Sequence, residues 1–409
     1  MRAILRIALA CLLAAPVIVA LPATPAVAAP ACGPTGDPPP TEAPWPLRRL
    51  DPRSVWPLSR GDGVRVAVID SGVSATHPVL KGKVLPGRDF GLPNHAGQCD
   101  ENGHGTMVAA IIAGRDDTGV PFWGVAPGAE ILPIRVMRNE ERSLDEALPG
   151  RIAEAIRYAV AQDADVVNLS LETDPTPELE RAIQEALEKN VVVVAAAGNR
   201  AGQQGNRRVY PAAYEGVLAV GGIDEQGNHV NTSMQGDYID VAAPGLMIQG
   251  PAPRGNGYRV VPEGGTSYAA AYVSGVVALV RARYPDLTAS QVVWRVTRTA
   301  DRPPEGRNNR VGYGVVNPYQ AVAAVTGTKS HPPAETLDPA PTPPDPLATT
   351  KVVAVWTAVG GTLVAALLLA SMPIIRSGRR RGWRPGPVRP ADRSARPGST
   401  AAPGAAPGG

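Results

Sequence analysis

The chain has 409 residues and a formal net charge of only +3, and much of its positive charge belongs to arginines close to the carboxyl terminus. The composition therefore implies no nucleic-acid partner. The length allows one large α/β domain with a sizeable core and further segments at both ends.

The amino terminus has the layout of a secretory signal peptide over residues 1–28. A short basic start precedes an apolar run from Ile7 to Val19, and the small residues Ala26 and Ala28 frame a signal-peptidase site. An uncleaved anchor is the alternative, but the apolar run is short for a membrane span of about 20 residues. The sequence therefore predicts export.

A segment rich in proline and glycine, residues 29–54, follows the predicted signal peptide. Cleavage after Ala28 removes Cys11 and leaves Cys32 and Cys99 in an oxidising compartment. We interpret these two cysteines as one disulfide, with two free thiols as the alternative. About 25 residues are too few to fold alone, so we expect this N-terminal extension to wrap the domain as a structural strap rather than to act as a folded inhibitor.

Residues 55–325 alternate between apolar β-branched runs, which predict buried parallel strands, and amphipathic patterns, which predict crossover helices. Ser143 followed by Glu146 predicts a capping box that opens one helix. Thr176 before Pro177 predicts the start of another. The fold class is therefore α/β, a doubly wound, mostly parallel sheet with helices on both faces, and a site should lie beyond the carboxyl ends of its strands. The predicted strands span residues 64–69, 130–137, 165–170, 191–196 and 217–220.

The chain beyond the domain predicts a membrane span. Residues 326–351 are rich in proline and read as a semi-rigid linker. The uncharged stretch 352–375 would extend roughly 36 Å as a helix, enough to cross a hydrocarbon core of about 30 Å. A buried core helix is the alternative, although the sequence on both sides of the stretch is typical of disorder. The arginines that follow place the tail, residues 376–409, in the cytoplasm and the domain outside, in a single-pass protein of the cell membrane.

Four segments carry residue types that suit acyl transfer, and each also has a simpler explanation. Asp70 ends a predicted strand, where an aspartate often serves only as a cap. His104 lies between two glycines, which let a substrate backbone approach the imidazole, although a solvated loop histidine would look similar. Asn199 follows a buried strand, as a turn asparagine would. Ser267 opens a helix, where a serine is usually an N-cap but where the helix dipole also favours a negative charge forming on a substrate.

Taken together, these residues resemble the subtilisin family of serine proteases over roughly residues 55 to 325. The resemblance rests on the order Asp, His, Asn, Ser and on the blocks Val-Ile-Asp-Ser-Gly, Gly-His-Gly-Thr and Gly-Thr-Ser-Tyr-Ala. It implies that Ser267 attacks a peptide carbonyl, that His104 accepts the serine proton and that Asp70 orients the imidazole. It also implies that Asn199 donates a hydrogen bond to the oxyanion, that the substrate is a protein or peptide, and that no metal or cofactor is required.

The sequence departs from the family pattern in three places. Ala271 stands where a proline is usual, and Met107 stands where many relatives have a second histidine. A Leu-Glu-Thr sequence replaces the usual Gly-Gly edge of the substrate cleft, so that Leu171, Glu172 and Gly198 are the predicted cleft residues. This change would narrow or charge the cleft, which favours a selective protease over one for general digestion.

The whole architecture most resembles the mycosins, the proteases associated with type VII secretion. The resemblance implies that Cys32 is bonded to Cys99 and that the partner is the type VII secretion membrane core complex. Two alternatives stay open: a scaffold of that complex whose protease site is rarely used, and a housekeeping cell-surface protease with no fixed partner. Asp116 and Asp117 lie where relatives place a calcium loop, although two solvated turn acids explain them equally well.

Overall fold

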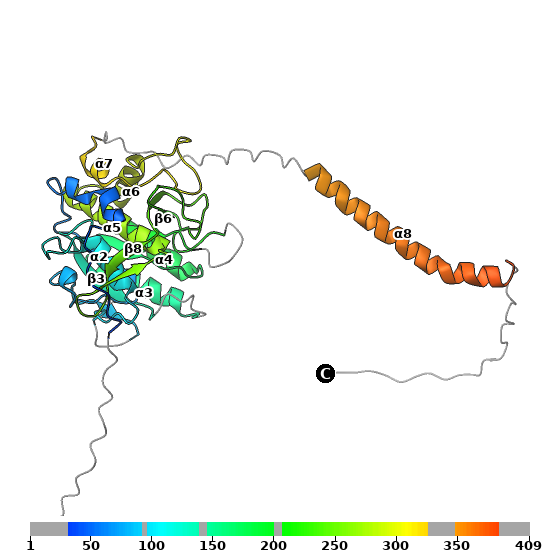
Figure 1. Ribbon diagram of the computed structural model, residues 1–409, viewed down its shortest axis with the longest axis horizontal. Coiled ribbons are helices and arrows are strands. Elements are labelled where there is room, and N and C mark those ends of the chain that lie inside the picture. Colours follow the sequence, from blue (N-terminus) through cyan, green and yellow to red (C-terminus); the bar gives the residue numbers. More distant parts are fainter. Residues whose placement is uncertain (1–31, 92–95, 139–144, 200–206, 326–347, 384–409) are drawn as a thin grey trace, which may run out of the picture. The chain divides into compact units, whose positions relative to one another are not determined.

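The computed structural model of the protein describes residues 32–91, 96–138, 145–199, 207–325 and 348–383 (Figure 1). The predicted signal peptide, most of the predicted linker and most of the predicted tail lie outside these ranges. The chain divides into two units, Met1–Ser330 and His331–Gly409, and each is described by itself.

The first unit is built on a parallel sheet, which has seven strands within the described ranges, in the order β2-β3-β1-β4-β5-β6-β7. Successive side chains of a strand point to opposite faces, so Val66 and Val68 of β1 belong to one hydrophobic cluster, and Ala67 and Ile69 belong to another. Apolar cover on both faces explains the unbroken β-branched runs. The strands are β1 Arg65–Asp70, β2 Arg88–Asp89, β3 Glu130–Arg135, β4 Val166–Leu169, β5 Val192–Ala196, β6 Leu218–Ile223 and β7 Val241–Pro244.

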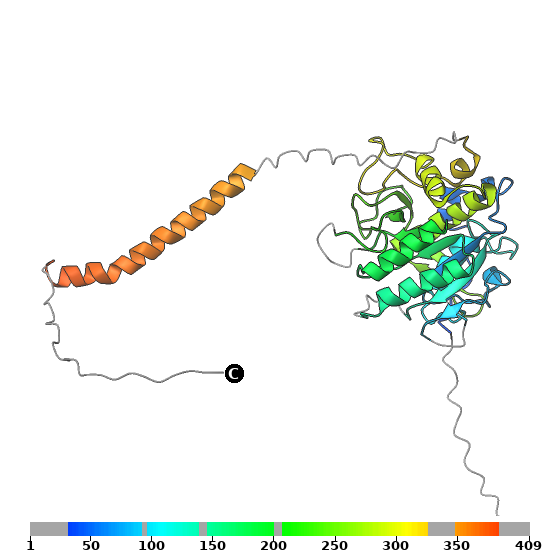
Figure 2. The same ribbon diagram turned by 180° about the vertical axis from the view of Figure 1, so that it is seen from behind.

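Helices cover both faces of this sheet (Figures 1 and 2). Side chains of α2, α5 and α6 fill the cluster on one face, and side chains of α3 and α4 fill the cluster on the other. The predicted doubly wound α/β fold is confirmed. The helices of the first unit are α1 Trp45–Leu50, α2 His104–Ala113, α3 Leu148–Ala161, α4 Pro177–Glu188, α5 Thr266–Arg283, α6 Ala289–Arg298 and α7 Pro318–Ala323, with short 3-10 turns η1 Pro52–Ser54 and η2 Pro78–Leu80.

The five predicted strands are confirmed as β1, β3, β4, β5 and β6, with ends that differ by up to three residues. The sequence did not predict β2, which has only two residues, or β7, whose Val-Ala-Ala-Pro sequence lacks a β-branched run. It also missed an antiparallel hairpin of β8 Ile248–Pro251 and β9 Tyr258–Val261. Short strands of small residues give a weak sequence signal because their partners, rather than their own side chains, stabilise them.

The predicted start of α3 is wrong. The helix begins at Leu148, and Ala147 at its N-cap makes no side-chain hydrogen bond, so Glu146 lies outside the helix. Ser143, the other half of the predicted capping box, lies outside the described residues. Pro149 in the first turn accounts for the start, since a proline fits there and is unfavourable deeper in a helix. The predicted start of α4 is confirmed, because the Thr176 side chain accepts a hydrogen bond from the Leu179 N–H (3.2 Å).

The N-terminal extension lies against the first unit as a strap. Asp37 exchanges two backbone hydrogen bonds of 2.8 Å with Tyr258 of β9. Trp45, Leu47 and Leu50 of α1 are buried, and Leu47 and Leu50 belong to the same hydrophobic cluster as α5. The extension is thus part of the core of the domain.

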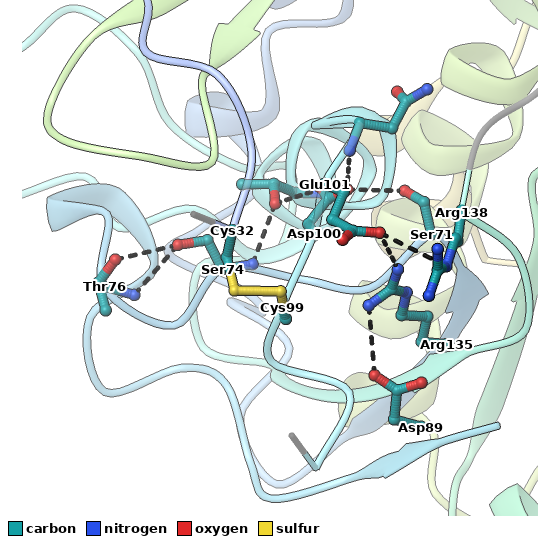
Figure 3. Close-up of a disulfide and its surroundings, with 12 residues drawn as sticks. Cys32, Ser71, Ser74, Thr76, Asp89, Cys99, Asp100, Glu101, Arg135 and Arg138 are labelled. Carbon is teal, nitrogen blue, oxygen red and sulfur yellow. Dashed lines mark hydrogen bonds and ion pairs between the residues drawn. A yellow bond between two sulfur atoms is a disulfide. The ribbon is translucent and has the colours of Figure 1, made fainter. Parts of the chain in front are cut away.

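A disulfide joins Cys32 of the extension to Cys99, as expected (Figure 3). The bond lies five residues before His104 and encloses a sequence separation of 67 residues. It therefore pins the start of the extension to the loop that leads into α2.

The second unit is one long helix, α8 Ala348–Arg380. Its segment Val353–Arg380 is the one helix in the described part of the chain that is long and apolar enough to cross a membrane. The helix runs through Pro373 and ends five residues beyond the predicted stretch 352–375. This 28-residue segment would be about 42 Å long.

Removal of the disulfide tests how far the strap depends on it. We expect the Cys32→Ser, Cys99→Ser double variant to lose up to about 4 kcal/mol of unfolding free energy, because the cross-link no longer limits the unfolded chain. Denaturant unfolding of the detergent-solubilised protein measures the loss. As a control, the wild-type protein is alkylated without reduction and its peptides are mapped by mass spectrometry. Alkylation of either Cys32 or Cys99 would contradict the pairing.

Candidate active site

A carboxylate and an imidazole form a buried pair at the carboxyl end of the central strand. Asp70 is the last residue of β1 and His104 is the first residue of α2, and both side chains are fully buried. His104 Nδ1 lies 2.8 Å from Asp70 Oδ1. A carboxylate oxygen can only accept, so Nδ1 carries the hydrogen, and Nε2 is the basic nitrogen whenever the ring is neutral. The Ser71 N–H also donates to Asp70 Oδ1 (2.7 Å).

The position of the pair follows from the strand order. β1 lies between β3 and β4, so the chain leaves β1 toward one side of the sheet and later returns to the other. Ligand sites of doubly wound sheets lie at such a point of reversal, beyond the carboxyl ends of the strands. The sequence placed a site at this edge, and the structure brings Asp70 and His104 together there.

Ser267 lies in the first turn of α5, against the end of β4. Its hydroxyl donates to the Ser170 carbonyl (3.1 Å), and the Ser170 hydroxyl donates to the Ser267 carbonyl (2.7 Å). The ring of Tyr268, the next residue, lies 5.2 Å from the ring of His104. The starts of α2 and α5 therefore meet at the same edge of the sheet. Ser170 was not singled out in the sequence, although it is the last residue of the predicted strand 165–170.

The Asn199 side chain is held in one orientation by the start of α5. Its Oδ1 accepts from the Thr266 N–H (3.0 Å) and from the Thr266 hydroxyl (3.2 Å). The same hydroxyl accepts from the Gly198 N–H (3.1 Å). Because Oδ1 is occupied in this way, the amide presents Nδ2 as its donor atom. Sequence reasoning missed Thr266, although this residue precedes the serine in the Gly-Thr-Ser block.

Two of the three predicted cleft residues lie next to each other. Gly198 has φ +96°, and a Cβ at this position would lie 3.1 Å from Glu172 Oε2 and 2.7 Å from Val209 Cγ1. Glu172 forms an ion pair with Arg207 (3.1 Å), and its side chain is 21% exposed. Leu171 instead packs into the cluster beneath α3 and α4. Sequence reasoning missed Arg207, since the pair spans 35 positions.

The two acids considered for calcium each pair with an arginine. Asp116 Oδ1 lies 2.8 Å from Arg60, and Asp117 Oδ2 lies 2.6 Å from Arg115. The hydrogen bond from Arg115 lowers the pKa of Asp117 from its usual value. Within the described ranges, no group of three or more His, Cys, Asp or Glu side chains is arranged to hold a metal ion.

The departures from the family pattern leave both helices regular. Ala271 is fully buried inside α5, which is continuous from Thr266 to Arg283, so the missing proline does not interrupt the helix. Met107 is buried in α2, and a Cβ on Gly250 of β8 would lie 2.5 Å from its Cγ. Met107 therefore packs against the β8–β9 hairpin.

Comparisons of the sequence and of the structure with known proteins point to the same family. Residues 61–314 match the Peptidase S8, or subtilase, family. Mycosin-4 of Mycobacterium tuberculosis (strain ATCC 25618 / H37Rv) is 37% identical over 374 residues, which cover 81% of this chain and 80% of the relative.

Two solved structures have the same fold. The MycP3 protease from the type VII (ESX-3) secretion system is 34% identical with a TM-score of 0.64, over 71% of this chain and 92% of that one. A chain of an intact ESX-5 inner membrane complex is 30% identical with a TM-score of 0.65, over 85% and 94% of the two chains. The chain is similar to mycosins along most of its length, and it belongs to the subtilase family of serine endopeptidases.

Proposed function

We propose that this protein is a membrane-anchored, extracytoplasmic serine endopeptidase associated with type VII secretion, and that Asp70, His104 and Ser267 form its catalytic triad. The observation that carries the proposal is the buried hydrogen bond between Asp70 and His104 beside the start of the helix that bears Ser267. This arrangement supplies a general base next to a hydroxyl nucleophile, which is what acyl transfer needs.

In the proposed reaction, Ser267 Oγ attacks the peptide carbonyl while His104 Nε2 accepts its proton. The hydroxyl first turns from the Ser170 carbonyl toward the imidazole, a rotation about one side-chain bond. Catalytic hydrogen bonds often form only when substrate is bound. Asp70 keeps the hydrogen on Nδ1 and stabilises the imidazolium. His104 then protonates the leaving amine, and water hydrolyses the acyl-enzyme by the same steps in reverse.

The negative charge on the carbonyl oxygen is stabilised at the start of α5. Asn199 Nδ2 donates to it, because Oδ1 of the same amide is held by Thr266. The Ser267 N–H is a second donor, and it lies at the positive end of the α5 dipole. Both donors are held by backbone and side-chain contacts before the substrate arrives, so little reorganisation is required.

The cleft supports a selective enzyme. The Glu172 carboxylate lies beside Gly198 and carries Arg207 as its partner. This ion pair occupies space that a Gly-Gly edge would leave open, and it puts charge where a substrate side chain would pass. The arrangement favours a restricted set of substrates over general digestion of proteins.

Membrane anchoring and secretion complete the proposal. The segment Val353–Arg380 would cross the membrane, with the arginines at its end in the cytoplasm and the catalytic domain outside. The association with a type VII core complex rests on the likeness to a protease of the ESX-3 system and to a chain of the ESX-5 inner membrane complex. Scaffolding of such a complex, or housekeeping at the cell surface, are the competing functions.

Replacement of the nucleophile tests the triad. We expect Ser267→Ala to abolish peptide hydrolysis and labelling by a fluorophosphonate probe, with an unchanged melting temperature, because only one hydroxyl is removed. Turnover by the purified variant at the wild-type rate would end the assignment. Ser290→Ala, at an exposed serine of α6, is the matched control that should label normally.

The same variant separates protease from scaffold in cells. If proteolysis is the main role, a type VII system that contains the Ser267→Ala variant should still assemble but should no longer cleave its substrate. Normal processing with the variant would favour scaffolding or a housekeeping role. Loss of assembly on deletion of the whole chain, measured by native gel, shows whether the protein belongs to the complex at all.

Removal of the oxyanion donor should act on the chemical step. We expect Asn199→Ala to lower kcat by about 10²–10³, the usual effect of the loss of one such donor, with little change in KM. Steady-state kinetics on a peptide substrate measure both constants. An unchanged kcat with a raised KM would make Asn199 a substrate-binding residue instead.

The strap should not need to be removed for activity. Its described residues pair with β9 and fill the core of the domain, which is the role of a structural segment. We expect protein with an intact amino terminus at Ala29 to label with the fluorophosphonate probe. Labelling that begins only after cleavage within residues 29–54 would show that the strap is an inhibitory propeptide.

A further inference from the structure

A second aspartate, Asp100, lies close to the Asp70–His104 pair without belonging to it. Asp100 is fully buried and directly follows the disulfide-bonded Cys99 (Figure 3). Its carboxylate accepts five hydrogen bonds from the chain around it. The donors are the Ser71 hydroxyl (2.9 Å), the Asn102 N–H (3.2 Å), the Gly103 N–H (2.7 Å), the Thr106 N–H (2.8 Å) and the Thr106 hydroxyl (2.5 Å).

These five donors come from two separate segments. Ser71 follows the strand that ends in Asp70, whereas the other donors belong to the loop and first turn that carry His104. Ser71 is the link, since its N–H donates to Asp70 Oδ1 and its hydroxyl accepts from the Gly105 N–H (3.0 Å). Hydrogen bonds thus run from Asp70 through Ser71 and Asp100 to the start of α2, and return through His104.

The carboxylate also replaces a missing helix cap. The N-cap of α2 is Gly103, which has no side chain, so the free N–H groups of the first turn need an acceptor from elsewhere. Asp100 accepts from two of them and places negative charge at the positive end of the helix. Burial raises the pKa of Asp100, and the hydrogen bonds from Thr106 and Gly103 oppose that rise. An ionised carboxylate has enough acceptor sites for all five of these donors.

The backbone leaves little room for the loop to compensate for a lost contact. A Cβ at Gly72, which has φ +103°, would lie 2.1 Å from the Cys99 carbonyl oxygen. The two segments therefore touch at their backbones, one residue away from Ser71 and from Asp100. The disulfide ties Cys99 of this same segment to Cys32 of the strap.

We propose that Asp100 is a positioning residue of the protease, which holds Ser71 and the first turn of α2 so that Asp70 and His104 keep their hydrogen bond. This proposal rests on the triad proposed above. A helix cap alone would explain the contacts to Gly103 and Thr106, but it would not explain the contact to Ser71.

Asp100→Asn in the full-length, detergent-solubilised protein tests the proposal. The amide cannot accept at both positions, so we expect the rate constant for labelling of Ser267 by a fluorophosphonate to fall about 10- to 100-fold, the scale of a small misplacement in an active site. The acid limb of its pH profile should move to lower pH, because loss of a nearby negative charge and of the Asp70 contact both destabilise the imidazolium. The probe fills no side-chain pocket, so the readout reports on the triad rather than on the cleft.

Thr288→Ala is the matched control, because it removes the capping box of α6, a helix that carries no residue of the triad. It should lower the melting temperature without a change in the labelling rate or its pH profile. If Asp100→Asn behaves in the same way, Asp100 is only a helix cap and the proposal is wrong.

Ser71→Ala keeps the proposal testable if Asp100→Asn does not fold. This variant removes the hydroxyl between the two segments but keeps the N–H that donates to Asp70. We expect a slower labelling rate with the same direction of shift in the acid limb, and an unchanged rate would overturn the proposal. Failure of the triad itself would look different, since Ser267→Ala would then still label.

Discussion

The hydrogen bond between Asp70 and His104 is the constraint on which the rest of the structure depends. It joins the end of β1 to the start of α2, two elements separated by a 33-residue connection, residues 71–103. Both side chains are fully buried, so neither water nor salt weakens their attraction. The connection has to return to the end of β1 within hydrogen-bonding distance. It is held there by the hydrogen bonds of Ser71 and by the close backbone approach of Gly72 to Cys99.

The other functional side chains are held by the same kind of junction between a strand end and a helix start. Ser170, after β4, exchanges two hydrogen bonds with Ser267 in α5. Asn199, after β5, is bonded to Thr266 one residue earlier in the same helix. Three neighbouring strand ends and two helix starts thus define one edge of the sheet. Groups fixed to regular elements are better aligned than groups on loops, and alignment of this kind lowers the barrier to acyl transfer.

The sequence predicted what depends on local pattern. The β-branched runs gave the five central strands, and Thr176 with Pro177 gave the start of α4. Features that depend on a distant partner were missed. β7 lies beside β6 and needs no β-branched run of its own, and the β8–β9 hairpin is completed by Asp37 of the strap. Arg207 was missed because its partner is Glu172, and the start of α3 was misplaced because a capping box is only four residues of pattern.

The strap has a consequence for the order in which the domain can fold. Trp45 of α1 donates to the Leu246 carbonyl, 201 positions later, and Asp37 pairs with Tyr258. When the chain is synthesised from its amino terminus, the apolar face of α1 is therefore exposed long before Leu246 and Tyr258, the partners of the strap, have been made. Cys99, by contrast, follows Cys32 by only 67 residues. The disulfide can therefore close its loop before the later strands and helices of the domain have emerged. Contacts between distant parts of a sequence form slowly, and the exposed helix would in the meantime be a natural target for a chaperone.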